Sequence, residues 1–326
     1  MKVLVTGANG LLGHHVVMQL QNANNDIRII LRGNPPIYFD MTNIESVGGN
    51  FFDYESLKIA ADGCDAIIHI AAVTSTNLLH YQDYTKINVV SSATLISVAD
   101  ALKIHRLIFV STANTIGFGN KDQPADETST IEYPFTKSFY ARSKVEAEKL
   151  FIEASNKPLR HVVIVNPTFM IGAFDTKPSS GKLMLMGYKK RIMFVPRGGK
   201  NFVAVTDVAT AICNALSVGN NGERYLASGV NLSFKEFYQI QSRVGEYTQK
   251  IIVLPDILLK IAGKLGDTIR FFGIKSELCS MNLNQLIVQE YYNNQKAKNE
   301  LALTSKSLEH AVNEALDWFK MTGKIN

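Results

Sequence analysis

Short apolar segments alternate with longer amphipathic segments along the first half of the chain. The short segments have four or five residues, mostly valine and isoleucine, which is typical of strands buried on both faces of a parallel sheet. The longer segments carry their apolar residues on one helical stripe. This alternation predicts an α/β fold with a doubly wound parallel sheet. The predicted strands are 3–6, 27–31, 66–70, 107–111 and 162–166, and the predicted helices are 11–24, 84–102 and 140–155.

The alternation weakens after residue 166, where loop-like stretches interrupt it. Residues 202–216 predict a short strand that leads into a helix. Ser233 and Glu236 form a Ser-x-x-Glu pattern before an apolar run, which predicts the first turn of another helix. The last apolar stripe predicts a helix that packs on the body of the protein, and its members are Leu308, Ala311, Val312, Ala315, Leu316 and Phe319.

Another apolar helix is predicted to begin at Pro255. Its apolar residues are Ile257, Leu258, Ile261 and Leu265. The stripe is compatible with a membrane-surface face, but we expect it to pack in a core or to form the wall of a pocket. Six large side chains of the C-terminal half are likewise expected to line an apolar cleft or to fill a core, namely Met184, Met186, Tyr188, Phe194, Phe271 and Phe272.

Charge and composition narrow the classes of partner. The chain has 34 Lys and Arg against 29 Asp and Glu, a net charge of +5, and it has no basic run, so nucleic acid is not an expected partner. No apolar stretch approaches ~18 residues, so we expect no membrane span. The first apolar run, 3–5, ends at once in Thr6 and Gly7, so we expect no signal peptide. The three cysteines are far apart, which predicts no metal site and fits a reducing cytoplasm.

A glycine-rich turn follows the first predicted strand. Its glycines have the spacing Gly-x-x-Gly-x-x-Gly between a strand and a helix. Glycine permits a tight turn and the close approach of a pyrophosphate, and the helix that follows offers free N–H groups and a positive dipole end. We therefore predict a dinucleotide site that is formed here by Gly7, Asn9, Gly10, Leu11, Leu12 and Gly13.

The wider glycine spacing resembles that of the extended short-chain dehydrogenase/reductases, the NAD(P)-dependent epimerase/dehydratase family. Segment 49–57 resembles the family's adenine-binding segment, with Asn50 in place of the usual acid and Phe51 beside it. Segment 69–72 resembles the family's His-hydrophobic-Ala-Ala stretch, which implies that Ala71 and Ala72 pass under the dinucleotide. The resemblance has motif support over residues 1–245.

The resemblance implies a Rossmann-type fold with a smaller C-terminal substrate-binding region. The dinucleotide-binding domain spans 1–166, and 201–226 returns to it. Segments 167–200 and 227–305 form the substrate-binding region, and 306–326 form the C-terminal packing helix.

The end of the second predicted strand selects between the two nicotinamide cofactors. An acid there binds the ribose 2′-hydroxyl of NAD, and a basic residue accommodates the 2′-phosphate of NADP. Strand 27–31 ends at Arg32, whose guanidinium suits a charge-assisted, bidentate contact with phosphate. We therefore predict NADP as the cofactor, with NAD as the alternative.

Four tyrosines are followed by a lysine four residues later, a spacing that places both side chains on one face of a helix. Three of these pairs stand in unsuitable places. One lies in the adenine-side half of the fold, the tyrosine of the second is followed directly by a proline, and the third lies near the C-terminal end. The pair Tyr140 and Lys144 alone begins a segment of good helix formers that follows strand 107–111. The other pairs are Tyr54/Lys58, Tyr133/Lys137 and Tyr292/Lys296.

In the family that the chain resembles, a tyrosine, a lysine and a Ser or Thr carry the catalysis. The resemblance implies that Tyr140 is the general acid/base and that Lys144 holds the nicotinamide ribose and lowers the tyrosine pKa. Segment 111–117 resembles the family's Ser-Ser/Thr-x-x-Val-Tyr-Gly segment, which places the hydroxyl that polarises the carbonyl on Thr112.

Two further positions follow from the same resemblance. Asn88 stands at the start of the central helix and is implied to position a water or the lysine. Asn166 and Pro167 resemble the family's segment that flanks the nicotinamide.

The chain is thus predicted to be an oxidoreductase that transfers a hydride between NADP(H) and a carbonyl or hydroxyl carbon of a small organic substrate. Arg32, the Asn166–Pro167 step and segment 202–209 resemble the dihydroflavonol-reductase-like branch of the family. We expect a cytoplasmic protein, and the family resemblance implies a homodimer formed through helices 84–102 and 140–155.

Two other functions remain open. The first is a nucleotide-sugar epimerase or dehydratase with tightly bound NAD, in which basic residues of the C-terminal half clasp a diphosphate. The candidates for that contact are Arg191, Arg197, Lys200 and Arg224. The second is a non-catalytic protein that senses NADP, against which the intact Thr112, Tyr140 and Lys144 set argues.

Overall fold

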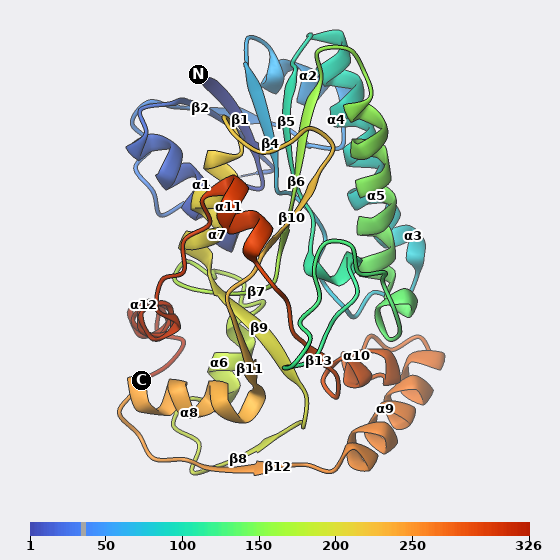
Figure 1. Cartoon of the computed structure of the whole chain (residues 1–326), viewed down its shortest axis with the longest axis vertical. Coiled ribbons are helices and arrows are strands. Elements are labelled where there is room, and N and C mark those ends of the chain that lie inside the picture. The colour runs from blue at the N-terminus through green and yellow to red at the C-terminus, as the bar shows by residue number, and fades with distance from the viewer. Residues whose placement is uncertain (34–36) are drawn as a thin grey trace.

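The central layer is a seven-stranded parallel sheet with the strand order β10-β6-β5-β4-β1-β2-β3, seen in the upper half of the computed structural model (Figure 1). The structure describes residues 1–33 and 37–326. All five predicted strands lie in this sheet. Its strands are β1 (Lys2–Thr6), β2 (Asp26–Leu31), β3 (Ile44–Gly48), β4 (Ala66–His69), β5 (Arg106–Val110), β6 (His161–Pro167) and β10 (Arg224–Ala227).

Helices cover both faces of the sheet, so the predicted doubly wound α/β fold is confirmed. Helices α1 (Leu11–Asn22) and α7 (Val205–Asn214) pack against each other on one face. Helices α2 (Tyr54–Ala61), α4 (Val90–Ala101) and α5 (Phe139–Ser155) cover the other face. The expected helix 84–102 is divided into α3 (Tyr81–Tyr84), a π-helical turn at Thr85–Val89, and α4.

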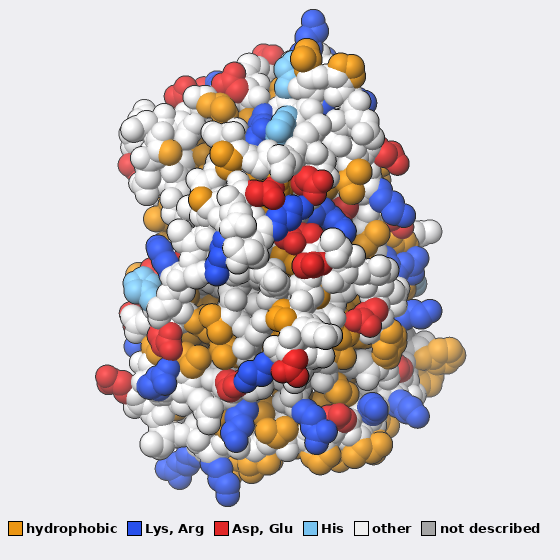
Figure 2. Space-filling view, in the orientation of Figure 1, with side chains coloured by type: hydrophobic (Ala, Val, Ile, Leu, Met, Phe, Trp, Pro, Cys, Tyr) orange, Lys and Arg blue, Asp and Glu red, His pale blue; other side chains and the backbone are white. Residues whose placement is uncertain are grey.

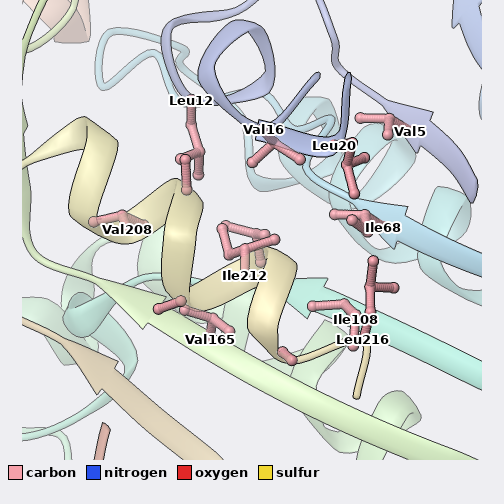
Figure 3. Close-up of a cluster of buried hydrophobic side chains, with 14 of the residues drawn as sticks. Val5, Leu12, Val16, Leu20, Ile68, Ile108, Val165, Val208, Ile212 and Leu216 are labelled. Atoms are coloured by element: carbon pink, nitrogen blue, oxygen red, sulfur yellow. The ribbon is translucent and has the colours of Figure 1, made fainter. Parts of the chain in front are cut away.

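The core under α1 and α7 explains why segment 202–216 lies against the central sheet. Figure 3 shows Leu12 and Val16 of α1 facing Val208 and Ile212 of α7 above the strands. Their partners in the sheet include Val5, Ile68, Ile108 and Val165, which are all buried. Helix α7 thereby covers apolar strand residues that would otherwise face water.

A smaller part, in the lower half of Figure 1, is built on two short sheets. The first has the order β11-β9-β13, and β7 also pairs with β9; the second pairs β12 with β8. The strands are β7 (Phe169–Ile171), β8 (Ile192–Val195), β9 (Gly199–Ala204), β11 (Val230–Ser233), β12 (Lys250–Val253) and β13 (Gln289–Glu290). The remaining helices are α6 (Gly181–Gly187), α8 (Phe234–Val244), α9 (Asp256–Phe271), α10 (Ser280–Gln285), α11 (Gln295–Leu301) and α12 (Leu308–Met321).

Several predictions for the C-terminal half hold in the structure, and others do not. Ser233 and Glu236 form a complete capping box at the start of α8. All six residues of the predicted terminal stripe are buried in α12. Helix α11 contributes Ala297 and Leu301 to the core under α1 and α7.

The expectation that the apolar stripe of α9 is buried is wrong. Ile257, Leu258, Ile261 and Leu265 are all exposed. Helix α9 packs through glycines on its opposite side, where a Cβ on Gly266 would lie 1.1 Å from the Leu278 carbonyl oxygen. Of the six large side chains expected in a cleft or core, Met184 is buried and Tyr188 is half-buried, whereas Met186, Phe194, Phe271 and Phe272 are exposed.

Candidate active site

The glycine turn is held so tightly that two of its glycines have no room for a side chain. Gly7 follows β1 with φ of +77°, and a Cβ there would lie 2.8 Å from the backbone nitrogen of Ala71. A Cβ on Gly13 would lie 2.0 Å from the Gly7 carbonyl oxygen. Gly7 and Gly13 therefore let β1, α1 and the segment after β4 approach one another.

Gly10 has a different environment. It is exposed at the N-cap of α1, and a Cβ on it would meet only the Gly7 carbonyl oxygen, at 3.4 Å. The first turn of α1 has no acidic residue, and the N-cap has no side-chain hydrogen bond. The helix thus presents its positive end and the N–H groups of its first turn, which fits the pyrophosphate of a dinucleotide.

The other predicted loop residues surround this helix end. Asn9 and Leu11 are half-buried on the turn, and Leu12 is buried in the core under α1, so it has only its backbone to offer a ligand. Ala71 and Ala72 follow β4, and Ala71 touches Gly7. The structure therefore brings the predicted pyrophosphate residues together.

His69 fixes the segment that runs beside the glycine turn. Its Nδ1 lies 2.8 Å from the Thr6 hydroxyl, which accepts a hydrogen bond from the Ala71 N–H at 3.2 Å. Its Nε2 lies 3.3 Å from the Ser91 hydroxyl of α4. Burial lowers the pKa of His69 to about 3, and the Lys144 charge adds to this effect, so the ring is neutral at physiological pH.

The predicted adenosine residues lie at one edge of the sheet. Arg32 is exposed immediately after β2, and the Gly49 N–H donates a hydrogen bond to the Leu31 carbonyl, which brings Asn50 next to that strand end. Phe51 packs against the core under α2 and α4. Within residues 1–33 and 37–326, the buried Asn50 Oδ1 has no hydrogen-bond partner, which fits a contact with an adenine edge.

Tyr140 and Lys144 lie on the same face of α5, whose N-cap Ser138 accepts a hydrogen bond from the Ala141 N–H. Thr112 stands two residues beyond the end of β5, and its hydroxyl is close enough to the Tyr140 phenol to favour the phenolate. The Lys144 Nζ donates a hydrogen bond to the Val110 carbonyl at 2.7 Å and lies 4.1 Å from the centroid of the Phe109 ring. The three predicted catalytic side chains therefore converge on the carboxyl end of β5.

The expected lowering of the Tyr140 pKa by Lys144 does not occur in this arrangement. Burial raises the Tyr140 pKa to about 12, a rise that the Thr112 hydroxyl opposes and the Glu148 charge reinforces. Burial also lowers the Lys144 pKa from 10.5 to about 7, against the opposing attraction of Glu148. The ammonium is directed at a backbone carbonyl and an aromatic ring, and desolvation dominates both groups.

A buried polar network beneath this site was missed by the sequence reasoning. Glu148 accepts hydrogen bonds from the Thr115 hydroxyl and the Asn166 amide, both at 2.7 Å. Asn166 also donates to the Thr112 carbonyl at 3.1 Å. The spacing of four residues from Tyr140 to Lys144 to Glu148 was the available signal, since it places all three side chains on one helix face.

Asn166 and Pro167, the two residues expected to flank the nicotinamide, lie at the same edge of the sheet as this network. Asn166 and Pro167 are buried at the end of β6, beside β5. The buried Asn166 Oδ1 has no hydrogen-bond partner in the part of the chain that the structure describes. This free acceptor lies in the same network as Thr112 and fits the expected contact with a carboxamide-bearing ring.

Asn88 hydrogen-bonds to the Val73 backbone and to the Ser143 side chain. Its Oδ1 accepts a hydrogen bond from the Val73 N–H at 2.8 Å, and its Nδ2 donates to the Val73 carbonyl at 3.1 Å and the Ser143 hydroxyl at 3.0 Å. The side chain therefore ties the segment after β4 to α5. Asn88 is a positioning residue for this segment, and its role in positioning a water or Lys144 stays a prediction.

Burial of Lys144 should make folding stability depend on pH. The folded pKa near 7 lies below the ordinary 10.5, so the unfolded chain binds the extra proton between these values and the stability of the wild type rises with pH there. Lys144→Met removes this titration. We therefore expect the difference in melting temperature, wild type minus Lys144→Met, to increase by several degrees from about pH 6.5 to about pH 9.

The exposed Lys58 provides the control for this measurement. Lys58→Met should keep a constant difference from the wild type across the same pH range. A constant difference for Lys144→Met as well would show that the Lys144 pKa is not depressed by burial.

The fold and the site together define a Rossmann-type protein with a glycine turn after β1 and a Thr, Tyr and Lys set at the end of β5. The sequence model of the NAD dependent epimerase/dehydratase family matches residues 3–228 of this chain. The chain belongs to this family, as the sequence resemblance implied.

The similarity to known proteins covers nearly the whole chain. "Sterol demethylase protein B" of Methylococcus capsulatus is 27% identical over 332 residues and 100% of both chains. A Synechocystis protein named "Putative dihydroflavonol 4-reductase" is 27% identical over 98% of this chain and 95% of its own. Among solved structures, UDP-glucose 4-epimerase of Thermotoga maritima with UDP-glucose is similar with a TM-score of 0.79, 19% identity and 99% coverage of each chain. These similarities support an enzyme of the extended type with a dihydroflavonol-reductase-like relationship.

None of the helices in residues 1–33 and 37–326 is both long enough and apolar enough to cross a membrane.

Proposed function

We propose that this chain is an NADP(H)-dependent oxidoreductase that interconverts a carbonyl and a hydroxyl group of a small organic substrate. The observation that carries the proposal is the convergence of Thr112, Tyr140 and Lys144 at the carboxyl end of β5. Ligands of open α/β sheets bind at this edge, and the glycine turn after β1 opens on the same edge.

The side chains can supply each proton movement that carbonyl reduction needs. A bound nicotinamide supplies the hydride. Tyr140 remains protonated at neutral pH, so it can donate its proton to the carbonyl oxygen as the alcohol forms. Thr112 lies beside the phenol and can donate a second hydrogen bond to the same oxygen. Lys144 lies one helical turn from Tyr140, with its Nζ held at the Val110 carbonyl, and can donate hydrogen bonds to the nicotinamide ribose.

The preference for NADP rests on Arg32. It is exposed at the end of β2, at the same edge as Asn50, where the adenosine ribose is expected. A guanidinium attracts a 2′-phosphate and gains nothing from the 2′-hydroxyl of NAD. We expect Arg32→Ala to weaken NADPH binding about tenfold or more and to leave NADH binding nearly unchanged, as measured by titration calorimetry.

Arg32→Lys is the matched control, because it keeps the charge and loses the bidentate geometry. It should retain part of the preference for NADPH. Equal affinities for both cofactors in the wild type, unaffected by either substitution, would remove the basis for NADP.

The second candidate is a nucleotide-sugar epimerase or dehydratase, supported by the likeness to the epimerase structure with UDP-glucose. Two of the basic residues that such an enzyme could use are already engaged. Lys200 is paired with the buried Glu290, and Arg224 donates to the Glu127 carbonyl at 2.7 Å. Arg191 and Arg197 are exposed at the two ends of β8.

The three functions give different results with the purified protein. A reductase should consume NADPH with at least one member of a panel of aldehydes and ketones. An epimerase should release bound NAD on denaturation and should convert a nucleotide sugar without net consumption of cofactor. Binding of NADPH without turnover of either substrate class would favour a sensor.

A further inference from the structure

Helix α9 has an apolar face that points away from the protein. Its inner side packs directly on the segment before α10, because a Cβ on Gly263 would lie 2.8 Å from Ser280 Cα and one on Gly266 would overlap the Leu278 carbonyl. Six large apolar side chains on its outer side are between 43% and 74% exposed, namely Ile257, Leu258, Ile261, Leu265, Ile269 and Phe272. At 100° per residue they form one stripe opposite the glycines.

The exposed apolar surface continues onto the neighbouring strands. Strand β12 leads into α9, and its Val253 is exposed together with Ile192 and Phe194 of the paired strand β8. Strands β8 and β12 and helix α9 lie at the lower end of the molecule in Figure 1. Figure 2 shows apolar and basic side chains interspersed along that end. We call the exposed side chains of β8, β12 and α9 the apolar end.

The apolar end also carries the positive charge of the protein. Segments 189–197 and 250–275 contain nine Lys and Arg and two Asp and Glu, whereas the rest of the chain contains 25 and 27. Within the described residues, none of these nine forms a salt bridge. Lys260 and Lys264 are exposed on α9, beside the apolar stripe. Apolar side chains that are bordered by unneutralised lysines are typical of helices that lie in a membrane interface.

We infer that the apolar end docks on the surface of an anionic lipid bilayer, with α9 lying in the plane of the interface. The exposed isoleucine, leucine and phenylalanine side chains would leave water for the acyl boundary, and the lysines would meet phosphate and carboxylate headgroups. A second copy of this chain is a poorer partner, because a symmetric contact would bring the two positive ends together.

Docking there would place the bilayer next to the candidate active site. Arg270 of α9 donates a hydrogen bond to the Leu78 carbonyl at 2.9 Å, and Asn282 of α10 donates to the Thr76 carbonyl at 3.3 Å. Both carbonyls belong to the segment that follows β4, which Asn88 ties to α5 through Val73. The apolar end is thus joined through short contacts to the edge of the site.

The test is cosedimentation of the whole protein with vesicles of phosphatidylcholine alone and of phosphatidylcholine mixed with phosphatidylserine. The wild type should sediment with the anionic vesicles, and added salt should weaken the binding. The double substitution Leu265→Ser and Phe272→Ser should reduce the affinity about tenfold or more, because both side chains are exposed and their loss costs only interfacial contact. Lys260→Glu with Lys264→Glu should abolish the preference for anionic vesicles.

Matched controls come from equally exposed residues elsewhere. Ile59→Ser with Leu159→Ser removes two exposed apolar side chains from the dinucleotide-binding part, and Lys58→Glu with Lys298→Glu makes the same charge change far from α9. Both control proteins should bind vesicles like the wild type. Sedimentation velocity without lipid shows whether the protein associates with itself. Comparison with Leu265→Ser, Phe272→Ser then shows whether that association uses the apolar end.

Three outcomes would overturn the inference. The first is the absence of wild-type binding to either vesicle. The second is binding that the α9 variants and the controls affect equally. The third is a dimer that Leu265→Ser with Phe272→Ser converts to a monomer, which would assign the apolar end to a second copy. None of these readouts depends on enzymatic activity, so the inference stands or falls independently of the proposed reaction.

Discussion

Tyr140→Phe should lower kcat/KM about a thousandfold while leaving the dissociation constant for the cofactor within a factor of about two. The substitution removes only the phenolic oxygen, which lies beside the Thr112 hydroxyl, and preserves the ring on α5. Without that oxygen no side chain at this position can give a proton to the substrate oxygen. The measurement is the rate of NADPH consumption with whichever carbonyl compound the wild type reduces.

Tyr133→Phe provides a matched control. Tyr133 is also followed by a lysine four residues later, but its side chain is exposed and its hydroxyl accepts a hydrogen bond from Asn284. We expect this variant to keep wild-type activity. Full turnover by Tyr140→Phe would defeat the assignment of Tyr140 as general acid/base, whatever the substrate.

The second large effect is expected at the glycine turn, where two similar substitutions should have very different consequences for folding stability. A Cβ on Gly13 would lie 2.0 Å from the Gly7 carbonyl oxygen, and backbone must move to admit it. Gly13→Ala should therefore cost about 3 kcal/mol of folding stability or more and also abolish cofactor binding. A Cβ on Gly10 meets that oxygen at 3.4 Å, so Gly10→Ala should fold with a nearly unchanged melting temperature.

Cofactor titration then separates the two roles. Gly10→Ala should weaken NADPH binding about tenfold or more, because the added methyl projects where the pyrophosphate approaches the end of α1. If Gly10→Ala binds the cofactor as the wild type does, the dinucleotide does not use this turn. If Gly13→Ala is as stable as the wild type, the backbone contact is looser than the structure describes.

Much of the central sheet was predictable because parallel strands that are covered on both faces need continuous apolar runs. The segments that become β1, β4 and β5 are such runs, and each is fully buried or nearly so. Strand β3 was missed because it lies at the sheet edge and exposes most of its residues, so it carries no such run. Strand β10 occupies the other edge and has only four residues.

The site was predictable to the extent that it depends on strand ends and helix spacing. Thr112 follows a strand, and Tyr140 and Lys144 share a helix face, so the parallel topology brings them together. The direction of the Tyr140 pKa shift was not predictable, because it depends on how much protein surrounds the oxygen. The helical spacing pointed to Glu148 itself, but its partners were out of reach, because Thr115 and Asn166 come from two other parts of the chain.

The stripe on α9 shows a different limit of sequence patterns. Periodicity identified an amphipathic helix but could not tell which of its sides faces the protein. The usual assumption that the apolar side packs inward was wrong here, since Gly263 and Gly266 provide the packing surface. Glycines at helical spacing opposite an apolar stripe were the signal that could have indicated the reversed orientation.

The chain passes more than once between the seven-stranded sheet and the smaller part of the molecule. This path restricts how such a protein can change its substrate. The backbone leaves the seven-stranded sheet after β6, returns through α7 to β10, and leaves again directly into β11. A fragment cut at residue 166 would lack α7 and β10 and would expose the apolar surface that Figure 3 shows beneath α7. On the proposed division of the chain, substrate specificity is exchangeable only through the two segments inserted between the strands of the central sheet. We therefore expect a chimera that swaps 168–198 and 228–288 to take its donor's substrate and to keep its own coenzyme.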